Sequence, residues 1–345
     1  MKTFTVIVAL GAATGFSTPA GRGGPHWQPQ TSGVTARLRG VSATSDRVAW
    51  ASGAGGTVIR TSDGGATWQP LGIPDTARLD FRDIDAVDER TAYALSIGAG
   101  QSSRIYRTTD AGASWTLQFT NDDPKAFFDA MAFWDAKRGL AISDSVDGRF
   151  VIITTADGGA HWTRVAPDAL PQALPNEGAF AGSGTNIAVL GSNTAWIGTG
   201  ASTISRVLRT TDGGRTWTIA NTPLVTSASA GIFSVAFRDP RHGLVVGGDY
   251  RKELDATSVA ATTEDGGVTW ASASGLTGFR SVVAHLPGEN TSWIAVGPQG
   301  ADVTEDDGRT WTKVEGAGYH AFSFAPGTHI GWGVGESGRI AKLIW

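Results

Sequence analysis

Short apolar stretches, separated by polar and glycine-rich segments, run along almost the whole chain. In the segment Ala36–Asp75, positions Arg37–Ser42 alternate between polar and apolar residues, and Val48–Ala51 and Thr57–Thr61 follow as further short runs. An alternation of period two predicts a β-strand, and tight turns between such runs predict hairpins. With a last strand beginning at Trp68, this segment predicts four short antiparallel strands.

A motif at the end of this segment recurs along the chain. It reads Thr-x-Asp-x-Gly-x-(Ser/Thr/His)-Trp, and its six copies are Thr61–Trp68, Thr108–Trp115, Thr155–Trp162, Thr210–Trp217, Thr263–Trp270 and Thr304–Trp311. The spacing of 41 to 55 residues is set by their aspartates, which are Asp63, Asp110, Asp157, Asp212, Asp265 and Asp306. Periods of this size indicate a repeat architecture, in which each repeat is one four-stranded blade of a β-propeller.

The motif itself is expected to form a hairpin turn. Apolar residues precede each copy, as in Val58–Ile59, and a tryptophan follows it. A short Asp side chain can accept hydrogen bonds from backbone N–H groups two residues further on, and glycine adopts a positive φ without steric cost. We expect the tryptophan to begin the next strand and to pack back over the turn. The six aspartates are therefore predicted to be structural and not catalytic.

The two ends of the chain are predicted to complete a seventh blade. The six repeats cover approximately Ala36–Asp75, Arg78–Asp122, Ala126–Asp168, Gly178–Asn221, Ala230–Ser274 and Gly278–Glu315. The last segment, Gly318–Trp345, contains only three candidate strands, whereas His26-Trp27-Gln28-Pro29 matches the tail of a motif without its Asp. We expect Pro25–Thr31 to pair with Arg339–Ile344, because closing the ring removes exposed strand edges. The prediction is an all-β protein with one seven-bladed propeller domain over residues 21–345.

The first twenty residues have the pattern of an export signal. Lys2 is followed by the apolar run Phe4–Ala13, and Thr18–Ala20 offers small residues at a cleavage site. This order predicts a signal peptide over residues 1–20 and a periplasmic or secreted protein, with a disordered tail as the alternative. The remaining sequence contains no run that is long and apolar enough to span a membrane.

Composition excludes several kinds of chemistry. The formal net charge of −4 gives no basic footprint for a nucleic acid. The chain has no cysteine, which excludes disulfides, thiol catalysis and cysteine-based zinc sites, and its six histidines are scattered. It also lacks a dinucleotide-binding Gly-x-Gly-x-x-Gly between a strand and a helix. We therefore expect no metal and no cofactor, and we expect a monomer.

The motifs and any channel site should lie on opposite faces. In a four-stranded blade the start of the first strand and the end of the second share one face, and the hairpin between strands three and four lies on the other. The residues that enter the first strands, in repeat order, are Arg39, Arg82, Phe128, Thr185, Phe233, Arg280 and His320. The next positions include Asp83 and Asp129, and nearby loops add Asp144, Glu177, Asp249 and Glu336.

These charged residues are predicted to ring one mouth of the channel. Guanidinium groups suit carboxylate or phosphate capture through paired hydrogen bonds, so the predicted ligand or partner site consists of Arg39, Arg82, Asp83, Arg280 and His320. The partner would be a protein segment or an acidic glycan. An alternative remains open, because charges gathered in this way can also form ion pairs that only tether neighbouring blades.

The repeat as a whole resembles two families. The motif resembles the Asp-box, or bacterial neuraminidase repeat, and Pro25–Trp345 resembles the photosystem II assembly/stability factor type of seven-bladed propeller, through Arg280-Ser281-Val282, Trp293–Gly297 and the six motif copies. The resemblance implies a non-catalytic assembly protein whose channel arginines, here Arg39, Arg82 and Arg280, bind a partner. Bacterial relatives of this type occur outside photosynthesis, and the loops around Glu177 and Asp249 lie outside the shared repeat.

A glycosidase is the alternative function. Sialidases also carry Asp-boxes and an arginine triad, and glycoside hydrolysis generally needs two carboxylates across the scissile bond. The candidates for these carboxylates are Asp144, Glu177 and Asp249. Against this function, sialidases have six blades, and only Phe81-Arg82-Asp83-Ile84 approaches their Phe-Arg-Ile-Pro signature.

Overall fold

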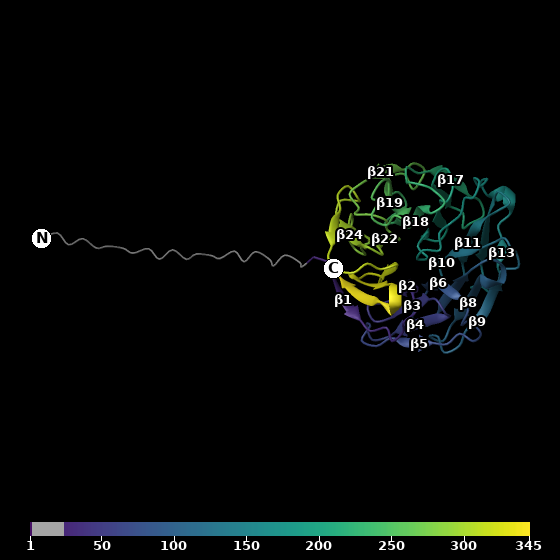
Figure 1. Cartoon of the computed structure of the whole chain (residues 1–345), viewed down its shortest axis with the longest axis horizontal. Helices are drawn as coiled ribbons and strands as arrows, with labels where there is room; N and C mark the ends of the chain where they lie inside the picture. The colour runs from purple at the N-terminus through teal and green to yellow at the C-terminus, as the bar shows by residue number, and fades with distance from the viewer. Residues whose placement is uncertain (2–23) are drawn as a thin grey trace.

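The computed structural model describes residue 1 and residues 24–345, so the predicted signal peptide lies outside the described residues except for Met1. Its strands form seven four-stranded antiparallel sheets arranged in a ring (Figure 1). The prediction of an all-β, seven-bladed propeller is confirmed.

Six blades follow one another along the chain, each from the ring centre outward. Blade 1 consists of β2 (Leu38–Ala43), β3 (Ala49–Gly53), β4 (Thr57–Thr61) and β5 (Gln69–Leu71). Blade 2 consists of β6 (Asp80–Ala86), β7 (Ala92–Ile97), β8 (Arg104–Thr108) and β9 (Thr116–Thr120). Blade 3 consists of β10 (Phe128–Phe133), β11 (Gly139–Val146), β12 (Arg149–Thr155) and β13 (Thr163–Arg164).

The next three blades repeat this order. Blade 4 consists of β14 (Ile187–Leu190), β15 (Thr194–Gly198), β16 (Arg206–Thr210) and β17 (Thr218–Asn221). Blade 5 consists of β18 (Ala230–Phe237), β19 (Gly243–Asp249), β20 (Ala260–Thr263) and β21 (Ala271–Ala273). Blade 6 consists of β22 (Val282–His285), β23 (Trp293–Gly297), β24 (Gly300–Thr304) and β25 (Thr312–Val314). Within residues 24–345, three short 3-10 helices lie in connections, namely η1 (Gly100–Ser102), η2 (Pro167–Ala169) and η3 (Glu336–Gly338).

Blade 7 joins the two ends of the described chain, as predicted. It contains β26 (Ala321–Phe324), β27 (Ile330–Val334), β28 (Ile340–Ile344) and, at its outer edge, β1 (His26–Gln30). In the antiparallel register, Trp27 faces Leu343. The Trp27 ring lies 4.4 Å from the ring of Tyr319 between their centroids, so the N-terminal strand is held by packing as well as by hydrogen bonds. Figure 1 shows β1 beside the C-terminus.

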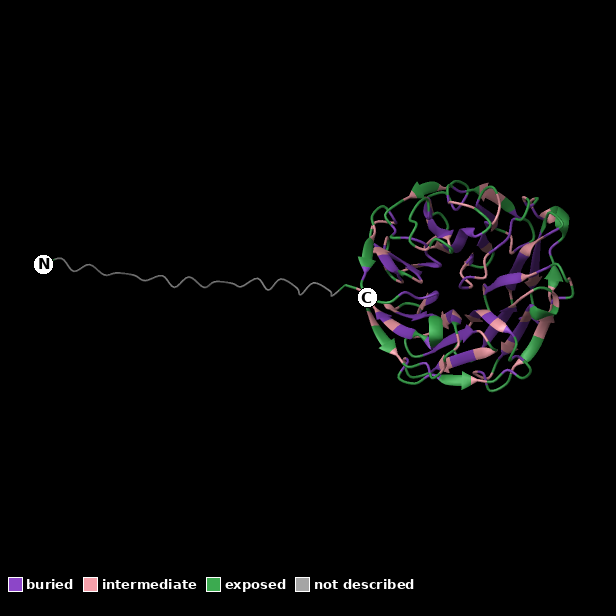
Figure 2. Cartoon of the chain, viewed as in Figure 1, coloured by how far each residue is buried: buried purple, intermediate pink, exposed green. Residues whose placement is uncertain are grey.

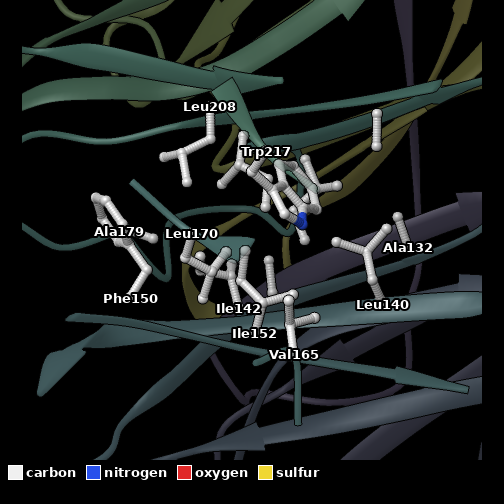
Figure 3. Packing of buried hydrophobic residues seen from close by; sticks show 14 of the residues in the cluster. Ala132, Leu140, Ile142, Phe150, Ile152, Val165, Leu170, Ala179, Leu208 and Trp217 are labelled. Atoms are coloured by element: carbon white, nitrogen blue, oxygen red, sulfur yellow. The ribbon is translucent and has the colours of Figure 1, made fainter. Parts of the chain in front are cut away.

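The hydrophobic core lies between adjacent blades. The inner three strands of most blades are buried, whereas the outer strands are largely exposed (Figure 2). Tryptophans in the second strands of four blades have no exposed surface, and these are Trp50, Trp196, Trp293 and Trp332. Between blades 3 and 4, the Trp217 side chain packs among Leu140, Ile142 and Leu208 (Figure 3).

The six recurrent motifs form turns between the third and fourth strands, hereafter the box turns. In the copy at Asp212, the carboxylate accepts the backbone N–H of Thr216 at 3.0 Å, the Thr216 hydroxyl at 2.6 Å and the Thr210 hydroxyl at 2.8 Å. We expected the Asp carboxylate to accept the backbone N–H two residues further on. This expectation is wrong, because the carboxylate accepts the N–H of the fourth residue after it. These hydrogen bonds outweigh the effect of burial and hold the pKa of Asp212 at about 2. The next strand begins one residue after Trp217, at Thr218.

Candidate functional site

A large cavity of the described chain lies at the channel mouth opposite the box turns. Its volume is about 830 Å³. It is bordered by the starts of inner strands, through Arg39 and Arg82, and by the ends of second strands or their loops, through Asp144, Tyr250 and Glu336. This placement agrees with the topology, because the box turns leave each blade at the other face.

Bulges in the inner strands decide which side chain enters this mouth. The pairing of the first two strands skips one residue in four blades, at Arg39, Arg82, Asp129 and Phe233. In blade 3 the equivalent of Arg39 is therefore Asp129, and the alignment that placed Phe128 there is wrong by one residue. A bulge leaves its extra residue out of the ladder and re-aims its side chain, which is common beside binding sites.

One segment of the chain crosses the mouth and was missed by sequence analysis. Residues 178–186, hereafter the channel segment, connect blades 3 and 4 without forming a strand. Their backbone reaches two blades, since Arg82 Nη1 donates to the carbonyl of Ala181 at 3.2 Å and Arg39 Nη1 donates to that of Gly182 at 3.5 Å. On the other side, the Ser183 hydroxyl donates to the carbonyl of Ser281 at 2.8 Å. The segment therefore forms a floor under the cavity.

Arg39 differs from the other arginines of the cavity in lacking an acidic partner. Arg37 pairs with Glu336 at 2.9 Å, and Arg82 pairs with Asp80 at 2.9 Å. Among the described residues no carboxylate lies within salt-bridge distance of Arg39, and its Nε is buried without a hydrogen-bond partner. Burial, followed by the positive charges of Arg82 and Arg37, lowers the pKa of Arg39 to about 10. An anion at this point would relieve that repulsion.

His320 also reaches the cavity, as predicted from its position in the column. Its Nε2 lies 2.8 Å from Glu336 Oε1, and its side chain is 10% exposed. Burial and the charge of Arg39 lower the pKa of His320, although Glu336 acts in the opposite direction. Glu336 contacts both Arg37 and His320 and holds them in place on this side of the mouth.

Arg280 was expected at the mouth, but the structure buries it. Its side chain is 1% exposed, and its Nε donates to Asp302 at 2.8 Å. Nη1 donates to the carbonyl of Phe279 at 2.8 Å, and Nη2 contacts Asp302 at 2.6 Å as well as the Thr277 hydroxyl. Every nitrogen of this guanidinium thus faces the protein, so Arg280 tethers its own blade. The sequence left open ion pairs between neighbouring blades, whereas this pair lies within blade 6.

The sequence did contain a signal for this pair. Asp302 occupies the third-strand position two residues before the threonine of the box turn. The other five repeats have apolar or aromatic residues there, namely Ile59, Tyr106, Ile153, Leu208 and Ala261. A carboxylate at an otherwise apolar position requires a buried cation, and Arg280 supplies it.

Asp83 is a contact between blades and does not face the cavity. Its Oδ2 accepts the backbone N–H of Met131 in blade 3 at 2.7 Å, and Asp85 makes the same contact with Phe133 at 2.8 Å. Gly184 packs against the carboxylate of Asp83, and a Cβ at this glycine would lie 2.1 Å from Oδ1. Burial raises the pKa of Asp83 to about 8 and that of Asp85 to about 6. Serine hydroxyls accept backbone N–H groups between other blades in the same way: Ser323 from Ala43, Ser42 from Ala86, and Ser234 from Val283.

The three candidate catalytic carboxylates have separate environments. Glu177 is enclosed, because Arg206 Nε and the Thr199 hydroxyl donate to Oε1 at 2.9 and 2.7 Å and its side chain has no exposure. Asp249 accepts the Ser229 hydroxyl at 2.7 Å and does not border the cavity. Asp144 borders the cavity without an ion-pair partner among the described residues, and it lies next to Asp129.

Asp129 and Asp144 form a pair of protonatable groups at the cavity. Burial raises the pKa of Asp144 to about 6. Burial and then the charge of Asp144 raise the pKa of Asp129 well above its ordinary value. Asp129 Oδ2 is buried and has no hydrogen-bond partner among the described residues. Within residues 24–345 no group of three or more His, Asp or Glu side chains is arranged to hold a metal ion.

None of the helices in the described chain could cross a bilayer. No family model matches the sequence, and no curated protein matches it. Solved structures match over most of the chain. YCF48 bound to D1 peptide is 17% identical, with a TM-score of 0.67 over 92% of this chain and 97% of that one. YCF48 from Cyanidioschyzon merolae is also 17% identical, with a TM-score of 0.66 over 92% and 98%.

Glycoside hydrolases share the fold as well. The GH74 xyloglucanase from Xanthomonas campestris is 17% identical with a TM-score of 0.63, covering 92% of this chain but only 53% of the enzyme. The GH74 enzyme from Niastella koreensis is 16% identical with a TM-score of 0.64, covering 91% and 53%. At these identities the similarity defines the fold, and a shared fold leaves the function to be argued from the site. This chain is thus a seven-bladed β-propeller with YCF48 and GH74 enzymes among its structural neighbours.

Proposed function

We propose that this protein is an exported, non-catalytic binding or assembly propeller whose channel mouth captures an anionic group of a partner protein segment. The observation that carries the proposal is Arg39, a guanidinium at the cavity without an acidic partner among the described residues. A carboxylate is the complementary group, because it accepts paired hydrogen bonds from a guanidinium. Five carboxylate-bearing residues line the same cavity, so the specificity would come from geometry and not from long-range steering.

The channel segment supports a peptide as the ligand. Arg39 and Arg82 already bind two successive backbone carbonyls, those of Gly182 and Ala181. The mouth therefore has the donors needed to hold an extended chain. One structural neighbour, YCF48, is described as bound to a D1 peptide.

We further infer that the box turns are Asp-boxes and that the protein is a bacterial relative of the photosystem II assembly factors that works outside photosynthesis. The inference is supported by the six equivalent turns, in which an Asp bridges a preceding threonine hydroxyl and the fourth residue after it. The pattern at residues 1–20 supports export to the periplasm or beyond.

Binding of a C-terminal carboxylate tests the proposal. Fluorescein-labelled peptides ending in a free acid or in an amide would be titrated with wild-type protein and Arg39→Ala by fluorescence anisotropy. We expect the wild type to prefer the acid about tenfold, and we expect the variant to lose that preference. Arg215→Ala is a matched control, since Arg215 is an exposed arginine at a box turn on the opposite face. Equal binding of both peptides by the wild type would refute the proposal.

A glycoside hydrolase remains the second candidate, favoured by the pair Asp129 and Asp144 in the cavity. One carboxyl kept protonated beside an ionised one is the arrangement that glycoside hydrolysis requires. Release of reducing ends from xyloglucan or of sialic acid from sialyllactose, abolished by Asp144→Asn, would replace the binding function with this one. The absence of turnover for both substrates is the outcome that we expect.

A further inference from the structure

Aromatic rings form the wall of the cavity on the side of blades 5 and 6. Phe180 of the channel segment stacks on Phe233 with a centroid distance of 4.2 Å and an interplanar angle of 11°. Phe279 meets Phe233 edge to face at 4.7 Å, and Tyr250 lies 6.2 Å from Phe233 and 6.5 Å from Phe180. All four side chains border the cavity. This group is hereafter the aromatic wall.

The same cavity also has a cationic wall of the same structural origin. Phe233 is the bulge residue of blade 5, and Arg39 and Arg82 are the bulge residues of blades 1 and 2. The same position in the repeat thus supplies guanidinium groups to one part of the mouth and a ring to another. The cavity therefore offers two different chemistries to one ligand.

Gly182 shows how close the two walls are. Its carbonyl accepts Arg39 Nη1 at 3.5 Å, and a Cβ at this residue would lie 2.9 Å from Cδ1 of Phe233. A single residue therefore contacts both walls. Consecutive Cα atoms are 3.8 Å apart, so a carboxylate and a side chain one or two residues apart in a ligand could reach both walls together.

Tyr250 is the most exposed member of the wall and has the most surface left to bury. Phe233 and Phe279 are 5% and 3% exposed, whereas Tyr250 is 42% exposed on the loop after β19. The Arg251 guanidinium lies over the Tyr250 ring at 5.8 Å, and Phe180 and Phe233 cover one another. A sugar would need an open ring face for stacking. The partly covered rings favour contact with an apolar side chain.

We propose that the aromatic wall is a subsite for an aromatic or branched apolar side chain near the C-terminus of the partner segment. The inference rests on the proposed function, since it assigns the carboxylate of the same segment to Arg39. Apolar burial against the wall adds affinity, and the short span between the walls restricts the apolar residue to the last positions of the segment.

Tetrapeptide probes separate the two subsites. Fluorescein-labelled Gly-Gly-Ala-Phe and Gly-Gly-Ala-Ala, each as the acid and the amide, would be titrated with wild type, Tyr250→Ala and Arg39→Ala. We expect wild type to prefer Phe over Ala by about tenfold. Tyr250→Ala should remove most of the preference for Phe and keep the preference for the acid. Arg39→Ala should remove the preference for the acid and keep most of the preference for Phe. Leu254→Ala is the matched control, because Leu254 is 77% exposed on the same loop and does not border the cavity.

The outcomes distinguish the inference from the function on which it rests. A Phe preference that Tyr250→Ala leaves intact, or no Phe preference in wild type, overturns the subsite but leaves carboxylate binding. No binding of any acid peptide overturns both. Binding of neutral xyloglucan oligosaccharides that depends on Tyr250, without peptide binding, would show that the wall serves a carbohydrate and would also refute the subsite.

Discussion

Replacing Asp83 by asparagine should stabilise the protein, and the gain should grow as the pH rises. The carboxyl is 5% exposed, accepts the N–H of Met131 at 2.7 Å and is closed in by Gly184. Burial raises its pKa from 3.8 to about 8, so between these values the folded state binds a proton that the unfolded state has lost. Stability from this group is therefore fully present below pH 4 and is lost as the pH rises towards 8.

The size of the effect follows from the pKa. Each pKa unit corresponds to about 1.4 kcal/mol, so a shift from 3.8 to about 8 sets a ceiling of about 6 kcal/mol. Asparagine keeps an oxygen for the Met131 N–H and carries no charge to desolvate. We expect the free energy of unfolding of Asp83→Asn to equal that of wild type near pH 4 and to exceed it by at least about 2 kcal/mol at pH 8.

Urea unfolding followed by tryptophan fluorescence at pH 4, 6 and 8 measures this difference. Asp85→Asn is the matched control, because burial raises the pKa of Asp85 only to about 6. Its gain should therefore be complete by about pH 6, whereas that of Asp83→Asn should continue to increase. A difference between Asp83→Asn and wild type that does not change with pH would refute the reasoning.

Three further substitutions test the fold and separate structural from binding residues. Trp27→Ala should lower the free energy of unfolding by about 2 kcal/mol through lost packing across the closing blade, and an unchanged urea midpoint would contradict this. Asp212→Ala should lower the free energy of unfolding by about 2 kcal/mol above pH 4 by removing turn hydrogen bonds. This loss should vanish as the pH falls towards 2, because the carboxylate of folded wild-type protein then becomes protonated. Peptide binding measured alongside should not change. Arg280→Ala should cost about 3 to 5 kcal/mol because it leaves Asp302 charged and buried, and loss of binding at unchanged thermal stability would show that Arg280 contacts the ligand.

The sequence by itself determined the architecture of this protein. The box turns are local, since their hydrogen bonds join residues two to four positions apart, and a local pattern can be recognised wherever it recurs. The strand at Trp27 carried the tail of the motif without its turn, which was enough to predict the pairing with Arg339–Ile344, and the observed pairing spans Ile340–Ile344. Ring closure followed because unpaired strand edges are unfavourable.

Only the tertiary structure decided which charged residues are available to a ligand. Arg39 and Arg280 occupy the same column of the repeat, yet one borders the cavity and the other is 1% exposed against Asp302. Arg39 is left out of the strand pairing by a bulge in blade 1, which directs its side chain to the cavity. Arg280 instead meets a carboxylate in the third strand of blade 6. The repeat pattern marks Asp302 as a carboxylate at an otherwise apolar position, but it does not register the unpaired residue, which depends on the register between two strands.

The floor of the cavity also required the three-dimensional structure. Residues 178–186 form no strand, although Thr185 was expected to enter one, and they contact blades 1, 2, 5 and 6, which lie far from them in the sequence. The path of an irregular segment is set by the partners that its backbone groups find, and these partners come together only when the ring closes. The sequence thus specified the blades and their number, and the closed ring determined the site.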